Sequence, residues 1–173
     1  AYVVDADALA HELLSLETGL GQQVLKLFGP QILQDGKIDR RKLAERVFTH
    51  PDQLEALEKL IHPAVFQKID ELYKQAKQTQ THALFVVEIP LLYELHVEDA
   101  YDVVVAVLAD EMIAKKRFHQ SGFTPNDYEK RMGRQWPPLQ KANRADYILI
   151  NNGSLDELRL EVEKLNAILK EKE

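Results

Sequence analysis

Residues 102–108 read Asp-Val-Val-Val-Ala-Val-Leu, a continuous apolar run that follows one acidic residue. Three further segments have the same character, and each of them ends at a polar residue: 2–4, 84–87 and 147–150. Continuous apolar runs are typical of strands covered on both faces, as in a parallel sheet between layers of helices. The sequence therefore predicts four buried strands.

Helical patterns fill the intervals between these strands. Asp39 is a candidate cap for a helix over residues 40–48, the apolar residues of 54–61 form one stripe, and Pro63 suits the first position of a following helix. Other helices are predicted over 111–120, after Thr124, and after the capping-box sequence 154–157. This alternation predicts an α/β fold, in which the helical stretch 39–78 is an insertion between the first two strands.

The composition narrows the class of protein. The chain has 173 residues, of which 45% are apolar and 29% charged, as expected for one globular domain over residues 1–173. It has no cysteine, so disulfides, thiolate metal sites and cysteine nucleophiles are excluded. We find neither a signal peptide nor an apolar run of membrane-spanning length, and we expect a soluble cytoplasmic protein without a membrane partner.

Charge is unevenly distributed along the chain. The net charge of −6 argues against a nucleic-acid partner. Residues 115–144, however, contain eight lysines and arginines against Asp127 and Glu129, a local balance of 8 − 2 = +6. Two interpretations are open: a solvated helical face, or a site for a polyanion such as a nucleotide.

Polar residues at the strand ends are the first candidates for a site, because ligands of open parallel sheets bind beyond the carboxyl ends of the strands. These residues are Asp5, Asp7, Glu88 with nearby Glu94, Asp110, Asn151 and Asn152. A carboxylate in such a place also serves as a helix cap, so Asp7 has two interpretations. The histidines form no metal-ligand pattern, so no metal site on the protein is predicted, and the glycines complete no phosphate-binding loop.

A set of short motifs, in order along nearly the whole chain, resembles the dephospho-CoA kinases. The motifs are Asp-Ala-Asp-Ala-Leu-Ala at 5–10, Phe-Gly at 28–29, the block 35–43, the pairs 47–48 and 57–58, Ile-His-Pro at 61–63, Pro-Leu-Leu-Tyr-Glu at 90–94, Arg117, Arg131, Gln135, Lys141, Ala-Asp at 145–146 and Asn-Gly-Ser at 152–154. The resemblance implies a three-layer parallel sheet of P-loop kinase type. It also implies an acceptor-binding helical insertion at about 39–78 and a helical lid at about 117–136.

The resemblance further implies an activity: transfer of the γ-phosphoryl group of ATP, with Mg²⁺, to the ribose 3′-hydroxyl of dephospho-CoA, the last step of coenzyme A biosynthesis. It implies that Asp7 is the carboxylate beside the acceptor hydroxyl and that Arg117 and Arg131 neutralise the transferred phosphoryl group. Asp5, Arg40, His62 and Glu94 are implied on the acceptor side, where Glu94 either hydrogen-bonds the acceptor or orients basic side chains. Gln135, Asn152 and Gly153 are implied beside ATP, together with the two lid arginines. The nucleotide interpretation of the basic segment is then favoured.

Two features depart from the family pattern. His11 stands where the family usually has an arginine. The family's Gly-x-x-Gly-x-Gly-Lys-Ser/Thr loop does not occur in these 173 residues, and we expect them not to turn over ATP by themselves. Two alternatives stay open: a non-catalytic, kinase-like module that binds a nucleotide or CoA, and another P-loop kinase of small molecules.

Overall fold

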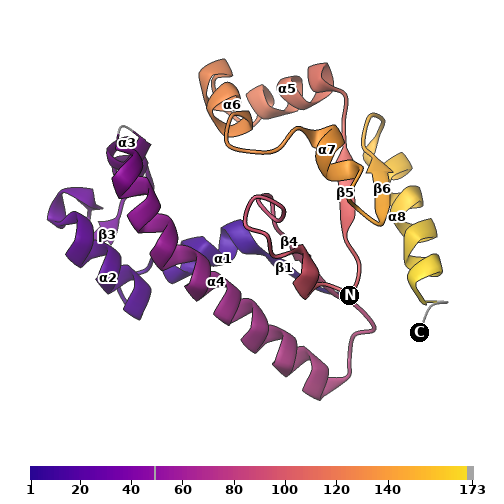
Figure 1. Ribbon diagram of the computed structural model, residues 1–173, viewed down its shortest axis with the longest axis horizontal. Coiled ribbons are helices and arrows are strands. Elements are labelled where there is room, and N and C mark those ends of the chain that lie inside the picture. The colour runs from indigo at the N-terminus through magenta and orange to yellow at the C-terminus, as the bar shows by residue number, and fades with distance from the viewer. Residues whose placement is uncertain (49, 171–173) are drawn as a thin grey trace. The chain divides into compact units, whose positions relative to one another are not determined.

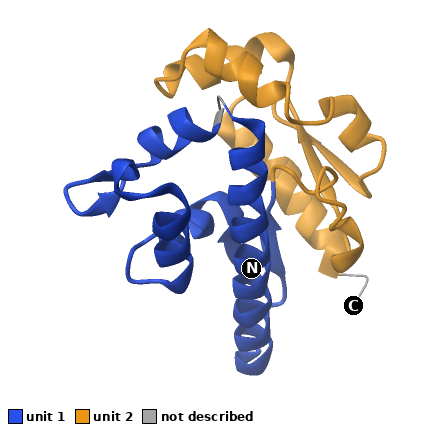
Figure 2. Ribbon diagram, turned by 60° about the vertical axis from the view of Figure 1, so that its left-hand side comes forward, with its two compact units in different colours: residues 1–89 blue, residues 90–173 orange. Residues whose placement is uncertain are grey.

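The computed structural model describes residues 1–48 and 50–170. Strands and helices alternate along these residues (Figure 1), which confirms the predicted α/β class. The chain forms two compact units, residues 1–89 and 90–173 (Figure 2), and each contains one pair of parallel strands. The sequence predicts a single domain with an insertion at 39–78 and a lid at 117–136. That organisation depends on how the two units fit together, and it stays a prediction.

Two of the predicted strands pair in unit 1. Strand β1 (Tyr2–Asp5) runs parallel to β4 (Phe85–Glu88), with Tyr2 opposite Phe85 and Asp5 opposite Glu88. Four helices lie between them in sequence: α1 (Ala6–Leu13), α2 (Gly19–Phe28), α3 (Arg40–Phe48) and α4 (Pro51–Thr79). The carboxyl ends of β1 and β4 therefore share one edge of this sheet.

Unit 1 has two hydrophobic clusters, and α4 contributes to both. The first joins α2 and α3 to α4 through Val24, Phe28, Leu43, Val47 and Leu57, with Leu14, Leu20 and Ile32. The second joins β1 and α1 to α4 through Val4, Ala6, Leu9, Val65 and Ile69. Burial of these side chains fixes the insertion against the strand that carries Asp5.

Pro63 does not begin a new helix, contrary to the prediction. It lies inside α4, which continues for 29 residues from Pro51 to Thr79. A proline there removes one backbone hydrogen bond and strains the preceding turn. The helix continues because Leu57 before it and Val65 after it are both buried, and Ile61 packs against both clusters. Burial on both sides of Pro63 outweighs the local preference for a break.

A short hairpin precedes α3. Strands β2 (Leu33–Gln34) and β3 (Lys37–Ile38) are antiparallel, after a 3₁₀ turn at Pro30–Ile32. The two linking residues, Asp35 and Gly36, have φ of 50° and 71°. Positive φ at both positions is the geometry of a type I′ turn, for which Asp-Gly is a preferred sequence. The chain then enters α3 through Asp39, whose Oδ1 accepts the N–H groups of Arg41 and Lys42. This confirms the predicted cap.

Unit 2 contains the other strand pair. Strand β5 (Val105–Leu108) runs parallel to β6 (Tyr147–Ile150), after a 3₁₀ turn at Glu98–Ala100. Its helices are α5 (Glu111–Gln120), α6 (Pro125–Met132), α7 (Pro138–Ala142) and α8 (Leu155–Lys170). The predicted capping interactions at Thr124–Asp127 and Ser154–Glu157 are both present.

Within their units, the strands carry exposed apolar side chains as well as buried ones. In unit 1, Val4 is 6% exposed and faces the second cluster, whereas its neighbour Val3 is 68% exposed. In unit 2, Val107 and Ile148 are also exposed. The alternation arises because successive side chains of a strand point to opposite faces.

No helix in the described part of the chain has the length and apolar character needed to cross a membrane.

Candidate active site

Asp5 and Asp7 have different surroundings at the carboxyl end of β1. Asp5 is the N-cap of α1, and its Oδ1 accepts the N–H of Ala8 at 2.9 Å. Asp7 lies in the first turn of α1, where the partial positive charge of the helix N-terminus favours an anion. The capping interpretation therefore belongs to Asp5. A role for Asp5 in substrate binding stays a prediction.

His11 and Arg40 lie in the same electrostatic neighbourhood as the two aspartates. Desolvation, and then the positive charge of Arg40, lowers the pKa of His11, whereas Asp7 and Asp5 act in the opposite direction. The lowered pKa favours the neutral imidazole, and Arg40 supplies positive charge to this neighbourhood. A histidine of lowered pKa is a weaker cation than the arginine that the family pattern places at position 11.

His62 also lies in unit 1. It occupies α4 directly before Pro63 and is partly buried. Its proposed contact with the acceptor stays a prediction. Glu88, which the register places opposite Asp5, adds a further exposed carboxylate to this edge of the sheet.

In unit 2, the structure brings together three of the residues predicted to bind ATP. Arg117 of α5 donates from Nη1 to the Asn151 carbonyl at 2.7 Å and from Nη2 to the Gly153 carbonyl at 3.0 Å. Asn152 Oδ1 accepts the N–H of Asp110 at 2.7 Å. The planar guanidinium with its several donors suits such a two-point contact. Arg117 therefore fixes the loop after β6, and its role at the phosphoryl group stays a prediction.

Helices α5 and α6 form the body of the predicted lid. Phe118 stacks on Phe123 with ring centroids 4.8 Å apart and meets Tyr128 edge-on at 5.4 Å. Lys115 pairs with Glu129 of α6 at 3.4 Å. Arg131 lies near the end of α6 with its side chain exposed, and Gln135 follows in the return segment, half-buried.

Glu94 is held by its own chain. Its Oε1 accepts the Trp136 N–H at 2.6 Å and the Lys141 ammonium at 2.8 Å. Burial by itself raises the pKa of this carboxyl, but the hydrogen bonds from Lys141 and Trp136 outweigh burial and leave the pKa below its usual value. Of the two roles that the resemblance implied for Glu94, the geometry favours orientation of a basic side chain. Contact with the acceptor stays a prediction.

Around Glu94 lies a group of packed aromatic and charged side chains that the sequence motifs did not indicate. The indole stacks on Tyr93 with centroids 5.9 Å apart and planes 8° apart. The guanidinium of Arg144 lies 5.3 Å from the Tyr93 ring and 5.4 Å from the indole, and it pairs with Glu98 at 2.9 Å. The only advance signal was the Pro137-Pro138 pair after the tryptophan.

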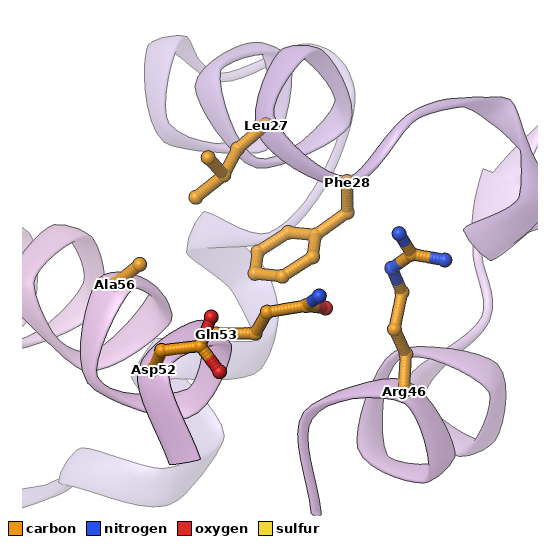
Figure 3. Close-up of a pocket in the computed structure, with 6 residues that line it drawn as sticks. All are labelled: Leu27, Phe28, Arg46, Asp52, Gln53 and Ala56. Carbon is orange, nitrogen blue, oxygen red and sulfur yellow. The ribbon is translucent and has the colours of Figure 1, made fainter. Parts of the chain in front are cut away.

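One surface hollow of about 270 Å³ lies in the helical part of unit 1 (Figure 3). Phe28 and Leu27 of α2 form its apolar side, and Arg46 of α3 and Asp52 of α4 form its polar side, with Gln53 and Ala56 completing the lining. The Gln53 side chain extends between the Phe28 ring and Arg46. None of the predicted site residues lines this hollow.

The described residues contain no group of three histidine, aspartate or glutamate side chains arranged to hold a metal ion. Mg²⁺ in kinase sites needs fewer protein ligands, since one or two carboxylates act together with the nucleotide phosphates. The exposed carboxylates of Asp7 and Glu88 at the strand edge fit that requirement.

Comparison with protein families decides between the interpretations. The model of the family described as dephospho-CoA kinase matches residues 1–157. The chain belongs to this family. Membership in the dephospho-CoA kinases makes the protein a phosphotransferase that uses ATP, and it favours that reading over a non-catalytic module or another small-molecule kinase.

Curated relatives support the same family along nearly the whole chain. The dephospho-CoA kinase of Protochlamydia amoebophila is 41% identical over 175 residues, which cover 98% of this chain and 85% of the relative. The dephospho-CoA kinase of Chlamydia muridarum is 38% identical over 171 residues, with the same coverage.

Two solved structures share the fold. The crystal structure of TT1252 from Thermus thermophilus has a TM-score of 0.79 and 32% identity, over 97% of this chain and 84% of that one. The dephospho-CoA kinase from Campylobacter jejuni has a TM-score of 0.69 and 26% identity, over 99% and 87%. The predicted resemblance and fold class of the dephospho-CoA kinases are thus confirmed.

Proposed function

We propose that the protein transfers the γ-phosphoryl group of ATP to the ribose 3′-hydroxyl of dephospho-CoA, with Asp7 at the acceptor hydroxyl. The observation that carries this role is the difference between the surroundings of the two aspartates at the end of β1. Asp5 caps α1, whereas Asp7 occupies the helix's first turn beside the neighbourhood of His11 and Arg40. A carboxylate in this place suits a group that orients the hydroxyl and accepts its proton.

The proposed step is an in-line displacement at phosphorus. The 3′-oxygen forms a bond to the γ-phosphorus as the bond to the β,γ-bridging oxygen breaks, ADP leaves, and the hydroxyl proton passes to the Asp7 carboxylate. Arg40 and His62 are the proposed contacts to the acceptor's phosphate or ribose. Arg131 is the proposed lid cation that neutralises charge on the transferring group.

Arg117 has an additional part in this proposal. Its two backbone contacts support a role in shaping the loop at Asn152 and Gly153 beside the adenine. Gln135 completes the proposed nucleotide contacts. Mg²⁺ bound to ATP would neutralise phosphate charge. The proposed location of the enzyme is the cytoplasm.

A panel of acceptors tests the function. The full-length protein is incubated with ATP and either dephospho-CoA or a nucleoside monophosphate, and products are separated and their phosphates located by ³¹P and ¹H NMR. We expect a new phosphate on the ribose 3′-oxygen of dephospho-CoA and at least about a hundredfold higher kcat/KM for that acceptor. Preference for a nucleoside monophosphate, or phosphorylation at another oxygen, would overturn the proposal.

A further inference from the structure

The carboxylate of Glu94 joins two segments that are far apart in the chain. Glu94 lies in the segment that follows β4, and the N–H it accepts belongs to Trp136. Lys141 of α7 completes the contact, since its ammonium also donates to the Pro90 carbonyl at 2.6 Å. The side chains of Glu94 and Lys141 are only 13% and 17% exposed. We call Glu94, Trp136 and Lys141 the lid-root latch.

The lid-root latch stands where the lid segment rejoins the rest of unit 2. The segment leaves β5 through Asp110, passes through α5 and α6, and returns by residues 133–136 to α7. The latched N–H is five residues after Arg131 and two after Arg134. The other root is held by Arg117, which binds the carbonyls after β6. Each end of the lid segment is therefore held by one charged side chain: Glu94, outside the segment, binds the Trp136 N–H within it, and Arg117, within the segment, binds backbone carbonyls outside it.

A contact of this type fixes position more effectively than it adds stability. A buried ion pair gives little net stability, because removing both charges from water offsets most of their attraction. A charge-assisted hydrogen bond to a backbone N–H, however, defines where that peptide lies. The Trp136 ring also stacks on Tyr93, and the Arg144 guanidinium lies beside both rings. The return segment of the lid is thus held both at its backbone and at its side chain.

We infer that Glu94 is a positioning residue for phosphoryl transfer, which acts through the lid-root latch to set where the lid arginines, and Arg131 above all, meet the transferring group. This rests on the proposed role of Arg131. The misplacement of a charged group by a fraction of an ångström weakens a transition state more than it weakens binding.

Glu94→Gln is the decisive variant, because its amide oxygen still accepts one N–H but the attraction for Lys141 is lost. We expect kcat to fall by about tenfold, with the KM values for ATP and dephospho-CoA each within about threefold of wild type. The amide of Trp136 is expected to exchange faster with solvent and to shift in the ¹⁵N spectrum. An unchanged kcat, or a rise confined to the KM for dephospho-CoA, would overturn the inference; the latter would assign Glu94 to acceptor binding.

Glu98→Gln is the matched control. Glu98 is also a partly buried carboxylate of the same packed group, 16% exposed, and it pairs with a basic side chain at 2.9 Å, but its partner is the Arg144 guanidinium and not the lid backbone. Glu98→Gln is expected to leave kcat unchanged. An equal loss of kcat in both variants would mean that general loosening of the group, and not the latch, is responsible.

A double-mutant cycle with Arg131→Ala separates positioning from other effects. If Glu94 acts through Arg131, Glu94→Gln adds little to the loss already caused by Arg131→Ala. The inference would be overturned if the two losses of kcat add fully, or if Arg131→Ala leaves kcat unchanged. Neither result would affect the acceptor panel, which tests the proposed function separately.

Should Glu94→Gln fail to fold, Lys141→Met removes the other half of the ion pair. The same changes in kcat and KM are then expected of that variant.

Discussion

Asp5 and Asp7 stand two residues apart and have different surroundings. The Asp5 carboxylate accepts the Ala8 N–H and so caps α1. Asp7 belongs to the first turn of that helix and shares its neighbourhood with His11 and Arg40. The two arginines of the predicted lid also differ in place: Arg117 of α5 binds backbone carbonyls after β6, and Arg131 lies near the end of α6.

Asp7→Asn tests the proposed role of this carboxylate. We expect kcat to fall by about 10²- to 10⁴-fold, because the amide cannot accept the hydroxyl proton. ATP binding, measured by calorimetry, is expected to change little. Asp5→Asn asks the converse question, since asparagine caps a helix about as well as aspartate. A larger loss of kcat in Asp5→Asn than in Asp7→Asn would reverse the assignment.

At the scale of elements, packing decides where local sequence is ambiguous. Helix α4 continues through Pro63 because its two halves are buried in different clusters. Close packing also constrains the start of helix α2. There the Thr18 hydroxyl caps the helix by accepting the N–H of Gly21. A β-carbon on Gly21 would overlap the carbonyl oxygen of Ser15, whereas one on Gly19 would meet nothing within 4 Å.

Gly21→Ala and Gly19→Ala are therefore expected to have opposite effects on stability. Gly21→Ala should lower the free energy of unfolding by about 1–3 kcal/mol, because the preceding turn must move to admit the methyl group. Gly19→Ala should raise it by about 0.5 kcal/mol through the lower entropy of the unfolded chain. Urea unfolding of both variants measures the difference. Equal stabilisation by the two substitutions would show that the Ser15 turn yields without cost.

The strands were predictable because their signal lies in the run of apolar residues itself, as at 147–150. The caps at Asp39 and Thr124 were predictable for the same reason: a cap depends on residues within one turn of it. The hairpin at Asp35-Gly36 was missed, although that dipeptide is its usual turn sequence. Neither the continuity of α4 at Pro63 nor the exposure of Val3 could be predicted, since both depend on what packs there.

Family membership was recognisable from the order of the motifs. The roles of Asp7, Arg40 and Arg117 in the reaction stay predictions, although the structure brings Arg117 to the loop at Asn152 and Gly153 as the motifs suggested. Local sequence could not show which polar side chains are bound by other groups of the same chain. The carboxylate of Glu94 is bound by groups more than forty residues away, and a pattern that looks for substrate contacts has no means of recognising such a pairing.

At the scale of the whole molecule, the predicted site draws on both compact units. The proposed acceptor contacts Asp7, Arg40 and His62 belong to residues 1–89, and the proposed nucleotide contacts Arg117 and Arg131 belong to residues 90–173. The proposed phosphoryl transfer depends on positioning, so we expect the reaction to need residues of both units. The overall charge of −6 is compatible with this proposal, because the excess of cations is confined to the segment 115–144, which carries the proposed ATP contacts Arg117 and Arg131.

Several carboxyl groups make the stability of the molecule sensitive to acid. Their pKa values lie below the ordinary 3.8 of aspartate or 4.5 of glutamate, chiefly because of hydrogen bonds to the ionised form; in Glu94 those bonds also overcome burial, which acts in the opposite direction. The residues are Asp39, Glu94, Glu111, Asp127 and Glu157. The unfolded chain therefore binds more protons, and stability present above these ordinary values is lost as the pH falls through the lowered ones.

The prediction is a urea midpoint that is steady above the carboxyl range and falls progressively below it. His11 adds a loss of the same sign nearer its ordinary pKa of 6.5, because protonation favours the unfolded chain. Urea titrations across this range measure the trend, and Glu94→Gln should reduce its acidic limb. A midpoint that rises on acidification would contradict the charge arrangement described.

Trp136 is the only tryptophan of the chain, which also has six tyrosines. The fold stacks that single indole on Tyr93, with the Arg144 guanidinium and the His96 imidazole close to its ring, at the return end of the predicted lid. Tryptophan emission from this chain therefore comes from one position. Because that position adjoins the segment proposed to close over ATP, we expect nucleotide binding to change the wavelength and intensity of the emission, which offers a reporter in the unlabelled enzyme.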